Sequence, residues 1–192
     1  MNIFVLDEDP RVSAQMMIDK HVVKMPTESL QMMSANMVEL DVEAPYKQVM
    51  LNHPCTIWAR KSRQNFQWLR EHAQALCDEY SLRYENRIHS VDTTMQDFSH
   101  RFDEMERKLP DFGLTTFAIA MADEYRSKKI ESETDLDFVI RSYQNYYLNG
   151  KWDFATWKTK KPDWWPDNHI AMKQAERDEF VERIRRKLYG EL

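Results

Sequence analysis

The chain of 192 residues is poor in residues that form tight turns or crosslinks, with only three glycines, seven prolines and two cysteines. Glycine is the residue that most readily adopts the positive φ of hairpin turns, so the sequence leaves little room for β-hairpins. The same scarcity excludes a glycine-rich phosphate loop, and with it nucleotide binding of the P-loop or dinucleotide type. No apolar run approaches 20 residues, so we expect no membrane-spanning helix and no membrane partner.

The net charge limits which binding partners are expected, and the two cysteines bear on the redox state of the compartment. A net charge of −5 and a pI near 5.7 argue against a non-specific nucleic-acid coat, although they leave room for a local basic face. We recognise no secretory signal and therefore expect a cytoplasmic protein with reduced thiols. Cys55 and Cys77 lie in apolar surroundings that are typical of buried, inert thiols rather than of ligands or nucleophiles.

Large apolar side chains are abundant enough for a folded core. Hydrophobic residues make up 42% of the chain, which includes nine Phe, eight Tyr and six Trp. Their spacing predicts an all-α fold, a compact helical protein with a short extended N-terminal arm at residues 2–6. We expect residues 1–192 to form a single domain, with residues 169–192 as a peripheral C-terminal helix.

Helix signals divide the chain into segments. Asp9 is predicted to cap a helix that has Pro10 in its first turn. Pro26 should end or kink that helix at Met25, and a new helix should begin at Thr27. Ser62 is predicted to cap a long helix. Further helices are expected at about residues 54–60, 91–109, 136–148 and 170–188.

The densest group of chemically active side chains lies between Asp19 and Gln31. His21, Lys24 and Glu28 are three and four positions apart, so an unbroken helix would place them on one stripe, where a solvent-facing ladder of ion pairs is the alternative to a site. Pro26 bends that stripe and moves Glu28 to a first helical turn. The helix dipole there lowers the pKa of a carboxyl, so Glu28 would stay ionised and could stabilise a cationic intermediate.

Two further groups have both a structural and a functional interpretation. His53 stands at a helix entrance, where it could cap the helix or, with Arg60 and Arg63 close behind, carry protons or contact phosphate. A tract rich in tryptophan and lysine spans residues 152–165. It could belong to the core, or it could stack on unpaired bases while its lysines contact phosphates.

Several of these motifs resemble the pyrimidine-dimer DNA glycosylase/endonuclease V family known from phages. The resemblance lies in the run Asp19-Lys20-His21-Val22 followed by Glu28, in the segments at residues 52–58 and 76–80, and in the aromatic and lysine-rich residues 151–165. It covers about half of the chain, in short pieces.

The resemblance implies an enzyme that attacks the sugar of a damaged pyrimidine nucleotide with its N-terminal α-amine and uses a glutamate, here Glu28, to stabilise the sugar cation and assist elimination. Two features depart from the family. Position 2 is Asn2 rather than a small residue, so either Met1 supplies the amine or the protein lacks that nucleophile. The family's arginines beside and three residues after its glutamate are Thr27 and Gln31 here. The phosphate contacts must then come from Lys20, Lys24, Arg60 or Arg63, or else DNA is not the substrate.

The sequence therefore predicts a base-excision glycosylase with or without abasic-site (AP) lyase activity, acting on damaged or modified pyrimidines in double-stranded DNA, without a cofactor or metal. The predicted catalytic residues are Met1, His21, Glu28 and His53. The predicted DNA-binding residues, either phosphate clamps or stacking and wedge residues, are Lys20, Lys24, Trp58, Arg60, Arg63, Lys158, Lys161, Trp164 and Trp165.

Two alternatives remain open at this point. The first is a non-enzymatic phage accessory protein that binds a host protein through its acidic surface and aromatic tract. The second is a metal-dependent nucleotide hydrolase built on His21, Glu28 and His53, since imidazole and carboxylate suit Zn, Mn or Fe. No two histidines are three or four residues apart, which counts against the second.

Overall fold

The computed structural model describes residues 1–189, which form eight α-helices and two short 3₁₀ helices without a strand, so the all-α prediction is confirmed. The last three residues of the predicted C-terminal helix, 190–192, lie outside the part of the chain that the structure describes. The helices are α1 (Pro10–Met16), α2 (Asp19–Glu39), α3 (Pro54–Ala59), α4 (Arg63–Arg83), α5 (Ser90–Asp97), α6 (Ser99–Lys108), α7 (Asp135–Gly150) and α8 (His169–Tyr189), with η1 (Asp123–Tyr125) and η2 (Trp152–Phe154) beside α7.

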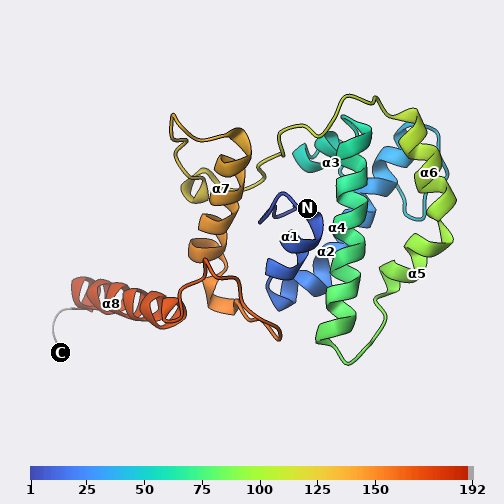
Figure 1. Cartoon of the computed structure of the whole chain (residues 1–192). Helices are drawn as coiled ribbons and strands as arrows, with labels where there is room; N and C mark the ends of the chain where they lie inside the picture. The colour runs from blue at the N-terminus through green and yellow to red at the C-terminus, as the bar shows by residue number, and fades with distance from the viewer. Residues whose placement is uncertain (190–192) are drawn as a thin grey trace.

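Helix α4 stands at the centre of the main body (Figure 1). It packs along α2 and α1, and α5 and α6 cover its other side. A long connection leads from α6 across the top of the molecule to α7, and α8 projects outward from there (Figure 1). Because the N-terminus lies between α4 and α7, residues from both ends of the chain can reach it.

Local capping signals set several helix starts as predicted. The Asp9 carboxylate accepts hydrogen bonds from the backbone N–H groups of Arg11 and Val12 at the start of α1. His53 caps α3 and Ser62 caps α4, each through a side-chain acceptor. The first helix ends earlier than expected, at Met16, because Met17 and Ile18 are extended. The predicted helix over residues 91–109 is two helices, which meet at Phe98.

The prediction that Pro26 ends a helix is wrong. Helix α2 runs unbroken from Asp19 to Glu39 with Pro26 buried inside it. Proline removes one backbone hydrogen bond, but the packing of α2 against α4 offsets that loss and tertiary contacts override the local signal. Lys24 and Glu28 therefore lie on one continuous helix.

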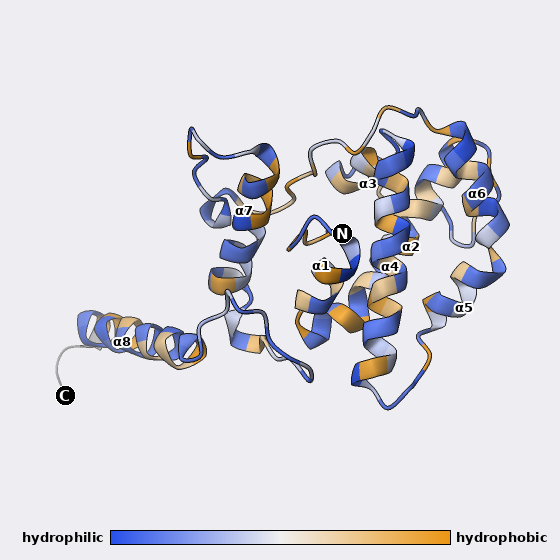
Figure 2. Ribbon diagram, in the orientation of Figure 1, coloured by the Kyte–Doolittle hydropathy of each residue, from blue (hydrophilic) through white to orange (hydrophobic). Residues whose placement is uncertain are grey.

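The N-terminal arm is part of the core. Ile3, Val5 and Leu6 are at most 1% exposed, and both cysteines are buried free thiols, as predicted. Apolar faces of the helices turn inward (Figure 2), whereas α8 is exposed along most of its length. None of the helices in residues 1–189 is long and apolar enough to cross a membrane.

Candidate active site

Glu28 lies at the meeting point of the N-terminus and helix α2. One carboxylate oxygen, Oε1, is 2.9 Å from the Lys24 ammonium, one helical turn earlier. The other, Oε2, accepts a hydrogen bond from the Asn2 backbone N–H at 3.1 Å and is 3.9 Å from the Met1 α-amine. The carboxylate therefore lies between the Lys24 ammonium and the α-amine.

Asn2 holds the α-amine in this position. Its side-chain oxygen accepts hydrogen bonds from the backbone N–H groups of Ile3 and Phe4, at 2.8 and 3.1 Å. Its side-chain amide donates to the Ala120 carbonyl at 2.6 Å. The residue that departs from the family pattern in the sequence is thus a structural anchor, and its only sequence signal is a polar side chain at the start of a buried apolar run.

His53 lies close enough to this pair to be influenced by both charges. Its Nδ1 caps α3 by accepting the Cys55 N–H at 3.2 Å, which is the structural role considered for it. Partial burial and the nearby α-amine lower the pKa of His53, and Glu28 acts in the opposite direction. We therefore expect a neutral imidazole at pH 7. Burial raises the pKa of the neighbouring Cys55 thiol to about 12, so it is not a nucleophile.

His21 is buried against the N-terminal arm rather than open to a substrate. Its ring stacks on Phe4, with centroids 4.2 Å apart, and its Nδ1 is 2.7 Å from the Tyr147 hydroxyl. Burial, assisted by Lys151 and Lys24, lowers the pKa of His21 to about 3. A neutral, enclosed imidazole suits a residue that positions the N-terminal arm, and it does not suit a phosphate contact.

Three lysines from two distant segments border the site. Lys20 and Lys24 come from α2, and Lys151 follows α7. The Lys20 ammonium lies 4.6 Å from the centroid of Phe154, and the Lys151 ammonium lies 4.6 Å from that of Tyr146 and 5.8 Å from that of Phe154. Sequence reasoning did not select Lys151. Its position beside aromatic residues was a weak signal, because only folding brings it next to α2.

Arg60 and Arg63 are engaged within the protein. Arg60 Nη1 donates to the Leu51 carbonyl and to the Asn36 side chain, at 2.7 and 3.2 Å. Arg63 donates to the Glu106 carbonyl at 3.0 Å and forms an ion pair with Asp111 at 2.7 Å. These contacts support structural anchoring better than a grip on phosphate.

The tryptophans proposed for stacking are mostly core residues. Trp58 is 4% exposed and stacks on Phe117, and Trp165 is also 4% exposed. Trp164 is partly buried and directs its indole N–H to the Met16 sulfur. Trp58 and Trp165 therefore lack the open face that stacking on a base requires.

The lysines of the C-terminal tract have partners inside the protein. The Lys158 ammonium lies 4.7 Å from the centroid of Tyr84, and Lys161 forms an ion pair with Asp167 and donates to the Trp165 carbonyl. The aromatic tract thus packs onto the body of the molecule, which leaves the host-protein alternative without a supporting observation.

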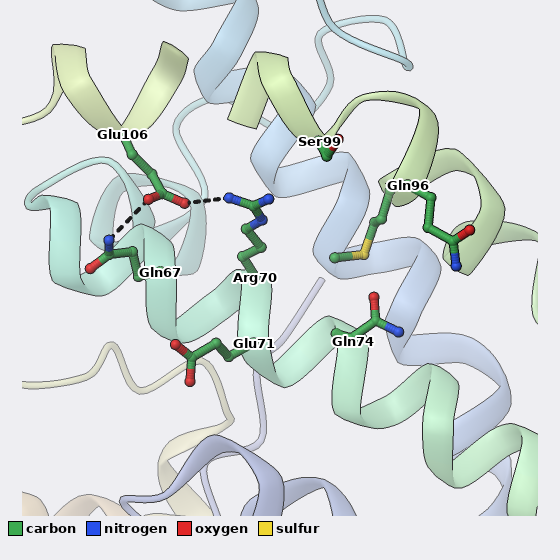
Figure 3. Close-up of a pocket in the computed structure, with 8 residues that line it drawn as sticks. Gln67, Arg70, Glu71, Gln74, Gln96, Ser99 and Glu106 are labelled. Atoms are coloured by element: carbon green, nitrogen blue, oxygen red, sulfur yellow. Dashed lines mark hydrogen bonds and ion pairs between the residues drawn. The ribbon is translucent and has the colours of Figure 1, made fainter. Parts of the chain in front are cut away.

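A separate cavity of about 500 Å³ lies between α4, α5 and α6, on the side of α4 away from the N-terminus (Figures 1 and 3). Its wall includes a polar network in which the Glu106 carboxylate accepts hydrogen bonds from Gln67 and Arg70, at 2.9 and 2.8 Å. Within residues 1–189, no group of three or more His, Cys, Asp or Glu side chains is placed to hold a metal ion, so nothing there favours the metal-dependent hydrolase.

Comparison with known proteins bears on the N-terminal part of the chain, which contains the amine and Glu28. Residues 1–92 match the family described as pyrimidine dimer DNA glycosylase. The distant resemblance inferred from the Asp19 to Glu28 motif is therefore confirmed for this part of the chain. The matched residues include Met1, Glu28 and His53 but not the aromatic tract at residues 151–165. Searches of curated proteins and of solved structures found no significant match.

Proposed function

We propose that the protein is a DNA glycosylase with AP lyase activity that acts on damaged or modified pyrimidines in double-stranded DNA. The observation that carries this proposal is the 3.9 Å separation between the Met1 α-amine and Glu28 Oε2. A nucleophilic amine beside a carboxylate is the pair that Schiff-base chemistry at a sugar carbon requires.

In the proposed reaction, the neutral amine attacks C1′ of the target nucleotide while the C1′–N bond breaks. The base leaves with the bonding electrons and takes up a proton, and loss of the amine proton and ring opening give an iminium ion between the α-nitrogen and C1′. Glu28 stabilises the positive charge that develops on the sugar. It then accepts the proton from C2′, which expels the 3′ phosphate, and water hydrolyses the remaining imine.

The three lysines supply the phosphate contacts that the missing arginines would otherwise make. Lys24 is 69% exposed although it pairs with Glu28, so its ammonium can also meet a phosphate. Lys20 and Lys151 both lie over the Phe154 ring, which contacts His21, and so add positive charge on that side of helix α2. Each phosphate that they neutralise releases counterions and adds affinity that depends on salt.

Trapping on abasic DNA tests the proposal without knowledge of the target base. The enzyme is incubated with a duplex containing one abasic site and reduced with borohydride, and we expect a covalent adduct and strand cleavage. Glu28→Gln should reduce cleavage by about 10²- to 10³-fold, the range for loss of one group that stabilises transition-state charge. Glu71→Gln, on an exposed part of α4, is the matched control and should behave as the parent.

The position of the tag tests the nucleophile. A chain extended at the N-terminus moves the α-amine away from Glu28 and should form no adduct, whereas a chain extended at the C-terminus should form it normally. Mass spectrometry of the trapped N-terminal peptide identifies the modified nitrogen. An adduct on a lysine, or no adduct and no base release across a panel of modified duplexes, would contradict the proposal.

A further inference from the structure

Helix α8 runs for most of its length without a partner in the molecule. Its first residue is fixed to the body, because His169 Nε2 lies 2.7 Å from the Leu148 carbonyl and the imidazole packs edge-on against Trp165. From residue 174 to residue 188 every residue is exposed, and the helix projects away from the other helices (Figure 1). An unsupported helix of about 15 residues is only marginally stable in water, because helices in proteins depend on the packing of one face.

The exposed segment carries an apolar stripe. Its large apolar side chains are 37–67% exposed, and they are Phe180, Val181, Ile184 and Leu188. At 3.6 residues per turn they fall within an arc of about 100° on the helix surface, the width of a face that packs against another element. Arg177 lies in line with this stripe one turn earlier, where its alkyl stem can cover apolar surface while the guanidinium stays in water.

The charges on the segment are divided by sign. Residues 176–182 carry four acidic side chains and one arginine, whereas residues 183–187 carry four basic side chains. Among residues 1–189, the ion pairs on α8 are Lys173–Glu176 and Glu182–Arg186. Most of the basic charge near the end of the helix is therefore available to a partner.

The two flanks of the stripe repeat this division. Residues seven or eleven positions apart return to nearly the same side of a helix, so Asp178 and Arg185 share one flank and Glu176 and Lys187 share the other. On each flank the acidic residue is nearer the start of the helix and the basic residue is nearer its end. A partner with the reverse order of charges would match both flanks.

A second copy of α8 in antiparallel orientation has that order. Antiparallel helices related by a two-fold axis bring identical flanks together and reverse their direction. If the axis passes through residues 181–182, Asp178 of one copy lies opposite Arg185 of the other. In the same register Glu176 lies opposite Lys187, so a single arrangement pairs all four flanks with opposite charges.

A parallel pair would have the opposite result. It would bring the two different flanks together at the same level, with Asp178 beside Glu176 and Arg185 beside Lys187 of the second copy. Like charges at such positions repel. The order of charges therefore selects the antiparallel orientation.

We propose that α8 is a dimerisation helix that pairs antiparallel with α8 of a second copy of this chain. In the register that the charges select, Phe180 and Val181 meet Ile184 of the second copy, and the stripe is removed from water. A nucleic acid would match only the basic end of the helix, because the acidic residues 176–182 would repel it. The pairing does not depend on any reaction with DNA, so it stands or falls separately from the proposed function.

Reversing one charge on a flank tests the pairing in the full chain. Sedimentation of the parent at increasing concentration should show a monomer–dimer equilibrium. Asp178→Arg and Arg185→Asp should each raise the dissociation constant about tenfold, because each replaces two ion pairs by two repulsions. Glu179→Arg makes the same change of charge as Asp178→Arg but on the opposite face of α8. It is the matched control and should leave the constant unchanged.

An equal mixture of the two charge variants tests the orientation. It should form a mixed dimer with the affinity of the parent, since each reversed side chain then faces an opposite charge, and the double variant Asp178→Arg/Arg185→Asp should dimerise like the parent. A chain that is monomeric at every concentration overturns the proposal, as does a mixture that regains no affinity. If Arg185→Asp weakens binding to duplex DNA and leaves the sedimenting mass unchanged, α8 contacts DNA instead and the pairing is wrong.

Discussion

Two clusters of charged side chains each include a carboxylate of helix α2, and they differ in whether their charged groups remain available to a ligand. At its start, Asp19 and Glu79 bind Arg83, whose side chain is 0% exposed. Nine residues further on, Glu28 binds Lys24, which is 69% exposed, and approaches the α-amine at 3.9 Å. The first cluster is sealed and the second is open.

Saturation of hydrogen bonds explains the difference. Arg83 also donates to the carbonyls of Met17 and Gln15, at 2.7 and 2.8 Å, so its guanidinium has no capacity left for a ligand. At the open site, the Lys24 ammonium and the α-amine each have donors to spare. An ion pair within a protein therefore indicates a functional site only when some of its groups remain available to a substrate.

Removing the arginine should produce the largest change in stability. Arg83→Leu leaves the carboxylates of Asp19 and Glu79 buried without their cation, and such a loss costs about 3–5 kcal/mol. The free energy of unfolding in urea measures the change. Lys24→Leu, at the open cluster, should alter it by less than about 1 kcal/mol. Equal losses of stability in the two variants would show that the cation contributes equally to folding in both clusters.

Lowering the pH should reduce the free energy of unfolding through protonation of His72. This side chain is fully buried beside Trp68, and burial lowers its pKa to about 3. Because the unfolded chain binds the proton from about pH 6.5 downward, the stability that the neutral ring provides is complete above that pH and is lost as the pH falls toward 3. Between pH 7 and 5 the loss is about 2 kcal/mol.

His72→Phe removes the titrating group and keeps the stacked ring. We expect its free energy of unfolding to fall by about 2 kcal/mol less than that of the parent between pH 7 and 5. His21, whose pKa is also about 3, stays in both proteins, so the difference reports His72 alone. Identical pH profiles of unfolding would show that His72 does not titrate in this range.

The smallest expected effect lies at the edge of the open site. Lys151→Ala should weaken binding to abasic duplex DNA several-fold and reduce the slope of log affinity against log salt by about 1, as expected for one lost phosphate contact. Lys187→Ala, on the exposed helix α8, should leave that slope unchanged. A Lys151 variant with the parent salt slope would remove this lysine from the DNA-binding surface.

Sequence and structure agree where a signal acts over a few residues. The caps at Asp9, His53 and Ser62 need only the next turn of backbone, and the all-α fold follows from helical spacing and a scarcity of turn residues. Pro26 is the exception, since contacts from outside its own helix hold it in place. The single-domain organisation remains a prediction.

The sequence alone determined that Lys24 and Glu28 are four residues apart, which is close to one helical turn. It did not determine that they share a helix, because Pro26 predicted a break between them. Only the tertiary structure decided what surrounds them. It places the α-amine beside Glu28, buries His21 against Phe4 and brings Lys151 next to α2, contacts that join segments far apart in the chain. Such contacts depend on how helices pack, and the packing of a whole core is not encoded in the spacing of any one segment.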